Sequence, residues 1–191
     1  MNPDKSRFAL PARDRILATA HELFYRDGIR ATGIDRVIAE AGVTKVTFYR
    51  HFPSKNALIL AYLEYRHRLW MDWLDEALKR HPCRAQDAAE QLIGVFREWF
   101  ESEHYRGCAF LNAVVELGGG FPEVAEIACR HKHEVTEVIA RLLPECPERE
   151  ERALAIAVVL DGAILRAQME KAASPALAAL QTSLRALVPA S

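Results

Sequence analysis

Four side chains able to hydrogen-bond with nucleobases or phosphates lie within seven consecutive residues: Thr44, Lys45, Thr47 and Arg50. Arginine and lysine pair best with the acceptor atoms of guanine, and a threonine methyl group can contact the methyl group of thymine. If this segment is a helix with Phe48 facing inward, the four side chains share the outward face. A short helix with such a face fits the major groove of DNA, which is about 12 Å wide.

The elements that must position this helix are short and are bounded by turn and capping residues. Apolar residues recur on one helix face from Ile16 to Phe24, and Gly28 follows at the place of a C-terminal cap. Thr32 is expected to begin a second short helix. Ala41-Gly42-Val43 supplies a tight turn, and Thr44 is a good N-cap for the third helix. This order of elements predicts a helix-turn-helix.

The charge of the chain is divided unevenly along its length. Residues 1–55 contain 10 basic and 6 acidic side chains, whereas residues 56–191 contain 15 and 20. A basic segment beside an acidic one indicates an anionic partner, commonly nucleic acid. No apolar run approaches the roughly 18 residues of a membrane helix, and the first residues lack the features of a signal peptide. We therefore expect a cytoplasmic protein with no membrane partner.

The periodicity of the remaining sequence is helical almost throughout, with no convincing alternating strand. A long helix is expected from Ser54 to about Arg80, and later helices near 85–103, 107–117, 122–143, 148–172 and 174–188. The predicted fold class is all-α, with about nine helices. We expect a three-helix helix-turn-helix domain over residues 1–55. A helical domain for ligand binding and dimerisation is expected over residues 56–191.

Residues 13–62 resemble the N-terminal pattern of the TetR family of repressors. The matching segments are Ile16 to Phe24, Gly28, Thr32 to Ile38, Ala41 to Phe52, Ser54-Lys55 and Leu58. The resemblance implies that bases are read by Lys45, Val46, Thr47 and Arg50. It implies phosphate contacts by Thr32, Thr44, Tyr49, His51 and Lys55. Val46 stands where the family often has a small residue, so the base preference cannot be carried over. Tyr49 could instead belong partly to the core, and His51 could cap the third helix.

The same resemblance implies a function as a ligand-responsive transcription regulator. Such a protein would bind a double-stranded, pseudo-palindromic DNA operator as a homodimer. It would act as a repressor and be released by a small apolar effector. Two alternatives stay open: a transcriptional activator, and a helical protein that binds a ligand or a metal ion but no DNA.

The segment Gly107-Cys108-Ala109-Phe110-Leu111-Asn112-Ala113, with His131-Lys132-His133 downstream, resembles regulators of the LmrA/YxaF-like subgroup. Aromatic walls with a few polar groups suit an apolar small molecule. The candidate ligand-binding residues are His67, Trp70, Met71, Leu74, Trp99, Tyr105, Cys108, Phe110, Leu111, Asn112, Val115 and Glu116. For each of these residues, ordinary core packing is the competing interpretation.

Dimerisation is expected through the last two long helices, whose apolar faces are broad. Two such helices from each subunit would form a four-helix interface. The candidate interface residues are Ile156, Val159, Leu160, Gly162, Ala163, Ile164, Ala167, Leu177, Leu180 and Leu184. The alternative is that these faces serve only the core of their own subunit.

The sequence offers no recognisable catalytic centre. It contains no phosphate-binding glycine loop with its lysine, no HExxH motif and no nucleophile in a familiar setting, so we expect neither an enzyme nor a cofactor. The four cysteines, among them Cys83 and Cys146, are widely spaced and are expected to be reduced thiols. Cys129 and His133 could begin a metal site, with Cys108 or His131 as a further ligand, but a complete ligand set is not expected. A redox role for Cys108 is a second alternative.

Overall fold

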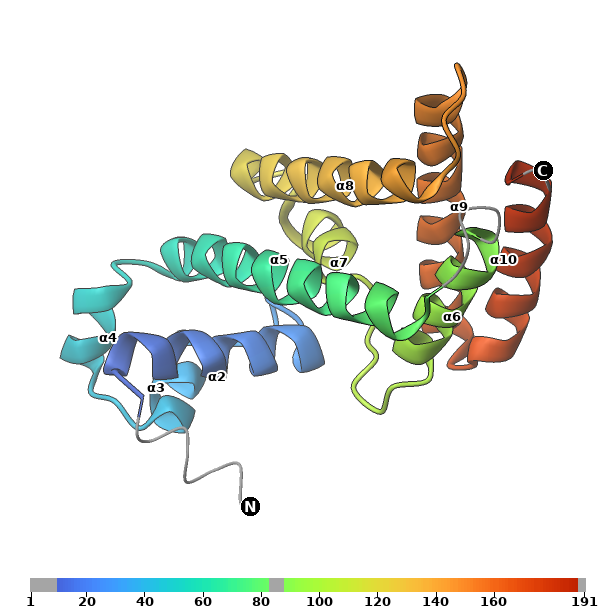
Figure 1. Ribbon diagram of the computed structural model, residues 1–191. Helices are drawn as coiled ribbons and strands as arrows, with labels where there is room; N and C mark the ends of the chain where they lie inside the picture. The colour runs from blue at the N-terminus through green and yellow to red at the C-terminus, as the bar shows by residue number, and fades with distance from the viewer. Residues whose placement is uncertain (1–9, 83–87, 189–191) are drawn as a thin grey trace. The chain divides into compact units, whose positions relative to one another are not determined.

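The computed structural model describes residues 10–82 and 88–188, which form helices joined by turns and loops (Figure 1). Within these two ranges the chain forms nine α-helices and no strand, which confirms the predicted all-α class. Cys83 and the first nine residues of the predicted DNA-binding domain lie outside the described ranges.

The chain divides into two compact units. The first contains the residues up to Arg68 together with Ala109–Ala128, and the second contains Leu69–Cys108 and the residues from Cys129 onward. This division differs from the predicted boundary at residue 55, because the long helix that follows contributes to the first core. Tyr62 of that helix packs edge-on against Phe24, with 5.3 Å between ring centroids. Whether residues 1–55 act as a functional domain of their own stays a prediction.

The first unit is built around three short helices and the first half of a long one. These are α2 (Ala12–Asp27), α3 (Ile34–Ala41), α4 (Lys45–His51) and α5 (Lys55–Arg80), and α2, α3 and α4 contact one another. Helix α7 (Ala109–Leu117) and the start of α8 (Pro122–Leu142) complete the unit. Apolar side chains of these helices form the core of the unit: Ile16, Leu17, Ala20, Leu23, Phe24, Val37, Ala41, Phe48, Phe52, Leu58, Ile59, Tyr62 and Leu63. Ile34 and Ile38, which the periodicity also places on the inner face of α3, are only half-buried.

Side-chain caps define the starts of two helices in this unit, α4 and α5. Thr44 caps α4 as predicted, because its Oγ1 accepts a hydrogen bond from the Thr47 amide at 3.1 Å. Ser54 Oγ accepts likewise from the Ala57 amide at 3.0 Å, at the start of α5. The expected start of α3 at Thr32 is wrong. The helix begins at Ile34 after Gly33, which is extended and offers no side-chain cap.

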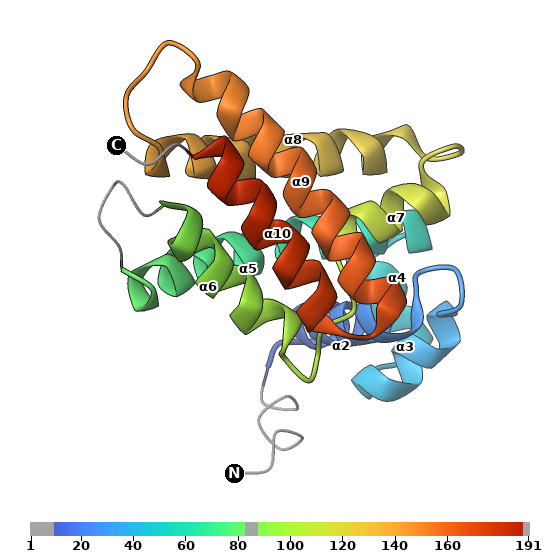
Figure 2. The same ribbon diagram turned by 90° about the vertical axis from the view of Figure 1, so that its right-hand side faces the viewer.

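The second unit contains α6 (Ala88–Phe100), α9 (Arg149–Glu170) and α10 (Ala173–Leu187), together with the later parts of α5 and α8. Helix α10 lies against both α9 and α6 (Figure 2). Their contact faces supply much of the core of the unit, including Leu92, Phe96, Ile156, Leu160, Leu177, Leu180 and Leu184. Among the helices of residues 10–82 and 88–188, none is both long and apolar enough to cross a membrane.

Candidate nucleic-acid interface

The turn between α3 and α4 depends on Gly42. This residue adopts the left-handed conformation, with φ 62° and ψ 42°, which costs glycine little because it has no Cβ atom. Its amide donates to the Ala39 carbonyl at 3.2 Å, and the Val43 amide donates to the Ile38 carbonyl at 3.2 Å. These bonds satisfy the last carbonyl groups of α3 and direct the chain into α4 after only three residues. The predicted tight turn is therefore confirmed.

Arg15 of α2 holds the same turn from the neighbouring helix. Its Nε donates to the Ala41 carbonyl at 3.2 Å, and one of its terminal nitrogens lies 3.5 Å from the Gly42 carbonyl. A cation at this place also interacts favourably with the negative end of the α3 dipole. Sequence reasoning missed this residue. Its partners are 26 and 27 positions away, and an arginine on a polar helix face gives no local signal of such a contact.

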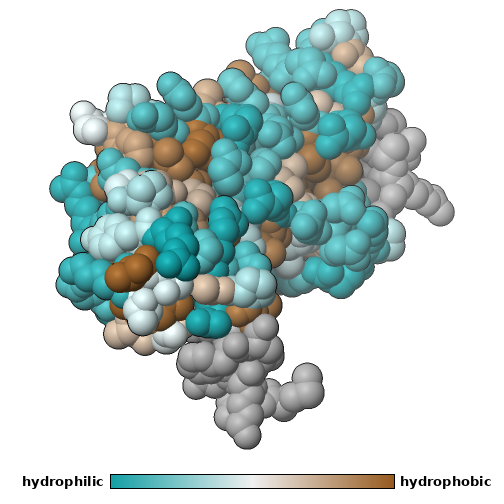
Figure 3. All heavy atoms as spheres, turned by 90° about the vertical axis from the view of Figure 1, so that its left-hand side faces the viewer, coloured by the Kyte–Doolittle hydropathy of each residue, from teal (hydrophilic) through white to brown (hydrophobic). Residues whose placement is uncertain are grey.

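Helix α4 presents a polar outer face and a buried inner one. Phe48 is fully buried, whereas Val46 is 69% exposed and Arg50 and Tyr49 are also exposed. Thr47 is half-buried, and its Oγ1 lies 2.9 Å from that of Thr44. Figure 3 looks at the side of the molecule on which α3 and α4 lie, and this surface is mainly hydrophilic with scattered apolar side chains. The four predicted base-reading residues therefore share one short, accessible helix.

Lys45 stays available for an external partner. Its Nζ lies 3.8 Å from a carboxylate oxygen of Asp35, but the two side chains are 67% and 91% exposed. An ion pair this exposed contributes at most about 1 kcal/mol, so a phosphate or a base can compete for the lysine.

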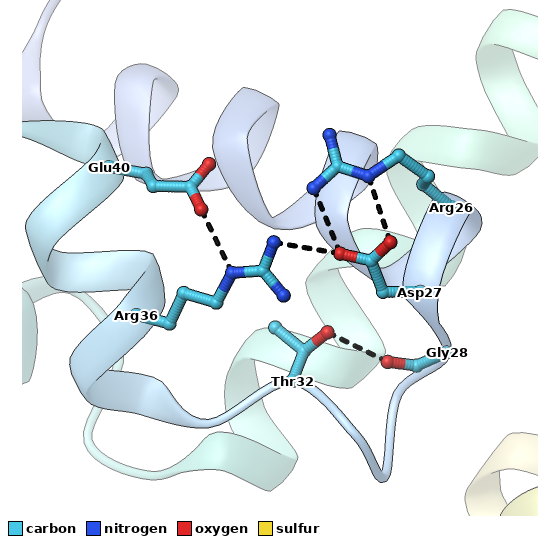
Figure 4. A network of polar contacts seen from close by, with 6 residues as sticks. All are labelled: Arg26, Asp27, Gly28, Thr32, Arg36 and Glu40. Carbon is cyan, nitrogen blue, oxygen red and sulfur yellow. Dashed lines mark hydrogen bonds and ion pairs between the residues drawn. The ribbon is translucent and has the colours of Figure 1, made fainter.

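A charged network links the end of α2 to α3 (Figure 4). Arg26 forms two hydrogen bonds of 2.8 Å with the Asp27 carboxylate, and Arg36 contacts the same carboxylate at 2.9 Å. Arg36 also donates to Glu40 at 2.9 Å. The hydrogen bonds from Arg26, assisted by the charge of Arg36, lower the pKa of Asp27 to about 2. The carboxylate thus stays charged and ties the first two helices together across the loop that joins them.

Two of the five residues predicted to contact phosphate form hydrogen bonds within the protein instead. Thr32 is fully buried, and its Oγ1 donates to the Gly28 carbonyl at 2.8 Å (Figure 4). Lys55 is half-buried, and its Nζ donates to the Ile29 carbonyl at 2.7 Å. Burial lowers the pKa of Lys55, while the charge of Glu116 opposes that shift. Both side chains have structural partners that argue against direct phosphate contact, and the sequence motif alone could not reveal them.

The other three predicted phosphate contacts lie at or near the surface. Thr44 is exposed at the start of α4, and Tyr49 is 41% exposed with its ring edge-on to Phe48 at 5.3 Å. Tyr49 is therefore both a partner of the core and accessible. His51 is half-buried in the last turn of α4. The hydrogen bonds of the described residues include none from its ring to a helix carbonyl, which argues against the capping alternative.

The predicted ligand-binding residues divide between the two units. The first unit contains His67, Phe110, Leu111, Asn112, Val115 and Glu116, and the second contains Trp70, Met71, Leu74, Trp99, Tyr105 and Cys108. Val115 is 87% exposed, and Glu116 binds two backbone amides of the first unit. In the second unit, the rings of Trp70 and Trp99 are 5.7 Å apart, and Trp99 lies 5.3 Å from Tyr105.

The aromatic residues of the second unit form a packed cluster. His131 is almost fully buried, and its ring lies 5.2 Å from that of Trp70. The Tyr105 hydroxyl donates to the Ile164 carbonyl at 2.7 Å, so the cluster is tied to α9. A role in core packing is established for these rings by their contacts. Their predicted role in ligand binding stays untested.

A cavity of about 490 Å³, partly open to solvent, lies in the second unit between α5, α6 and α8. Two predicted residues, Met71 and Leu74, line it. The sequence did not point to the other eight: Asp75, Leu78, Lys79, Pro82, Gln91, Val138, Arg141 and Leu142. Its walls are largely apolar, with charged side chains among them. The volume is within the range of about 300–1,000 Å³ that is usual for small-molecule sites.

Most of the predicted interface residues of α9 and α10 are buried in the core of the second unit. Buried among them are Ile156, Leu160, Ala163, Ile164, Ala167, Leu177, Leu180 and Leu184, whereas Val159 is half-buried and Gly162 exposed. A different stripe of α9 is exposed and apolar: Leu154, Val158, Leu165 and Met169. The alternative of a role in the subunit's own core therefore accounts for most of the predicted set.

No metal site is assembled within residues 10–82 and 88–188, where no three side chains of His, Cys, Asp or Glu come together. Cys129 Sγ lies 3.9 Å from His133 Nε2, but His131 is buried against Trp70. Cys108, Cys129 and Cys146 are free thiols.

The sequence and the fold both match known proteins. Residues 16–62 match the bacterial regulatory proteins of the tetR family. The chain is similar to SCO4454, a TetR-family transcriptional regulator from Streptomyces coelicolor, with 31% identity and a TM-score of 0.78. That alignment covers 99% of this chain and 97% of the other. The chain belongs to the TetR family of transcriptional regulators. The predicted helix-turn-helix domain and helical C-terminal part are thereby confirmed at the level of fold.

Curated TetR-family relatives match over shorter stretches. The transcriptional repressor KstR2 of Mycolicibacterium smegmatis is 29% identical over 106 residues, which cover 56% of this chain and 50% of the relative. The transcriptional activator FasR of the same organism is 44% identical over 89 residues, covering 47% and 39%. The chain thus spans about half or less of these relatives. All are transcription regulators and not enzymes. The resemblance to the LmrA/YxaF-like subgroup stays a prediction.

Proposed function

We propose that this TetR-family protein is a ligand-responsive repressor that binds a pseudo-palindromic DNA operator as a homodimer. The observation that supports this most directly is the outer face of α4. Lys45, Val46 and Arg50 are exposed on a helix of seven residues, which follows a tight turn and is buttressed by α2 and α3. Such a helix can enter the major groove and present its side chains to base edges.

Dimerisation is proposed through the exposed stripe of α9 instead of the buried residues predicted from the sequence. Leu154, Val158, Leu165 and Met169 are exposed and lie on one face of the helix. Exposed small residues of α10, Ala178 and Ala179, could let a second copy approach closely. A two-fold dimer would place two copies of α4 on half-sites about 34–36 Å apart.

The cavity between α5, α6 and α8 is the proposed effector site. Leu78, Val138 and Leu142 provide apolar walls, and Arg141 offers a cation for one polar group of a small, mainly apolar molecule. The effector must bind more tightly to the state that releases DNA, because equal affinity shifts nothing. A coupling of about 1–3 kcal/mol would weaken operator binding about 5–150-fold.

Selection of duplexes from a random pool by the purified protein tests the DNA-binding part of the proposal. We expect enrichment of sequences with two inverted half-sites, and binding of these duplexes should weaken steeply with salt. The same selection is run with the Arg50→Ala variant. If the wild-type protein enriched no duplex more strongly than the variant does, α4 would not be a recognition helix and the proposal would fail.

Activation is the second candidate, because the relative with 44% identity over the aligned segment is the activator FasR. A reporter gene placed behind the selected duplex separates the two possibilities. Repression predicts that expression rises when the gene for this protein is deleted, and activation predicts that it falls.

The effector site is tested by filling the cavity. Leu142→Trp should abolish the increase in melting temperature that a bound compound gives to the wild-type protein, while binding to the selected duplex persists. Compounds that stabilise the two proteins equally would bind elsewhere.

A further inference from the structure

Glu116 is hydrogen-bonded to the loop that precedes the helix-turn-helix. It lies near the end of α7, and its two carboxylate oxygens accept from two consecutive backbone amides. The Ile29 amide donates to Oε1 at 3.3 Å, and the Arg30 amide donates to Oε2 at 2.8 Å. Hydrogen bonds to a charged acceptor are stronger than neutral ones. All three residues belong to the first compact unit.

The same loop is held from a second helix. Lys55, at the start of α5, donates to the Ile29 carbonyl at 2.7 Å. The amide of Ile29 is therefore bound by α7 and its carbonyl by α5, while the Ile29 side chain is buried. With three contacts of this kind, the loop cannot shift without breaking at least one of them.

The position of this loop determines where α3 begins. It joins α2, which ends at Asp27, to α3, which begins at Ile34. The Asp27–Arg36 ion pair of 2.9 Å closes the network across it (Figure 4). Helix α3 in turn leads through the Gly42 turn into α4. A displacement of the loop would therefore move α3, and through the short Gly42 turn it would also move α4.

We propose that Glu116 is a positioning residue for DNA recognition, which holds the α2–α3 loop from α7 and thereby sets the orientation of α3 and α4. This rests on the proposed function. It also assigns Glu116, a candidate ligand-binding residue from the sequence, to a different task. Glu116 is not a DNA contact in this proposal. Removing its carboxylate should therefore weaken operator binding without removing a phosphate contact.

Hydrogen exchange of the Ile29 and Arg30 amides tests whether Glu116 fixes the α2–α3 loop, and it needs no DNA. In Glu116→Ala, exchange at Ile29 and Arg30 should accelerate about tenfold to hundredfold, since each amide loses a bond to a charged acceptor. Glu116→Gln keeps one acceptor oxygen and should give a smaller increase. Glu126→Gln, an exposed position on α8 in the same unit, is the matched control and should leave both amides protected. Unchanged exchange in Glu116→Ala, with an unchanged melting temperature, would overturn the proposal.

The consequence for recognition is measured on the duplex that the wild-type protein selects. Glu116→Ala should bind it about tenfold or more weakly, with the same dependence of log K on log salt, because no phosphate contact is lost. Equal affinity in the two proteins would overturn the positioning role. If the wild-type protein selected no duplex, the proposed function would fall, and amide exchange would still decide whether Glu116 holds the loop.

Discussion

Among the proposed base-reading residues, Arg50 has the side chain best suited to discriminate bases. It is exposed on α4, and a guanidinium can donate two parallel hydrogen bonds to guanine. Replacing Arg50 with alanine should cost about 1–3 kcal/mol of binding free energy and relax the preference at one base pair.

The measurement for Arg50 is binding to the selected duplex and to its single-base variants. Arg68→Ala removes another exposed arginine, from α5, and should leave both affinity and preference unchanged. A uniform loss of affinity across all duplexes would instead make Arg50 a phosphate contact.

Lys45 and Lys55 should differ in their response to salt. Lys45 is exposed and only weakly paired, whereas Lys55 is bonded to the Ile29 carbonyl. Lys45→Ala should lessen the slope of log K against log salt by about one if it meets a phosphate, whereas Lys55→Met should lower affinity with little change of slope. A lessened slope for Lys55→Met would restore the phosphate role implied by the family resemblance.

The packing of α2 against α5 has a pH dependence of its own. His21 of α2 lies among Tyr62, Tyr65 and Arg66 of α5, and its Nε2 is 3.2 Å from an Arg66 nitrogen. Burial, with a further effect from the charge of Arg66, lowers the pKa of His21 to about 4. Neutral histidine is therefore the form that the folded protein accommodates.

Unfolding measured against pH tests this arrangement. Between about pH 6.5 and 4 the unfolded chain binds the His21 proton and the folded protein does not, so the free energy of unfolding falls as the pH falls. One group contributes at most about 1.4 kcal/mol per pH unit. His21→Gln should remove this part of the dependence, and His104→Gln, at an exposed position, should keep it. Identical pH profiles for His21→Gln and the wild type would contradict the buried neutral state.

Helix α4 is short enough for its N-cap to matter. Thr44→Ala removes the acceptor for the Thr47 amide and should lower the free energy of unfolding by about 0.5–2 kcal/mol. Chemical denaturation gives the value. Val46→Ala in the same helix removes an exposed side chain and should change stability little.

At the scale of the whole molecule, the proposed function requires a dimer, which we place at the exposed face of α9. Val158→Glu places a charge in the middle of the apolar stripe, and it should convert a dimer to a monomer and abolish binding to a two-half-site duplex. Analytical ultracentrifugation measures the mass. Ser102→Glu adds the same charge at an exposed site outside α9 and should leave the dimer intact. A dimeric Val158→Glu protein would place the interface elsewhere.

The sequence determined the helices of the first unit nearly to the residue, because the signals that define them are local. The apolar period, the Gly42 turn and the caps Thr44 and Ser54 each act within a few positions. It also determined which residues of α4 face outward, because burying Phe48 leaves only one orientation for a helix of that length. Where the local signal was ambiguous, as at Thr32, the expected helix start was wrong.

Only the tertiary structure shows the roles of residues whose partners are far away in the sequence. Glu116 binds an amide 87 positions away, and Lys55 a carbonyl 26 away, and no periodicity encodes either contact. The broad apolar stripe of α9 could not show which part meets α10 and which stays exposed, since that depends on how the two helices pack. Local interactions fix the elements of this protein, whereas the packing of those elements fixes which of their side chains are left for DNA, ligand or a second copy.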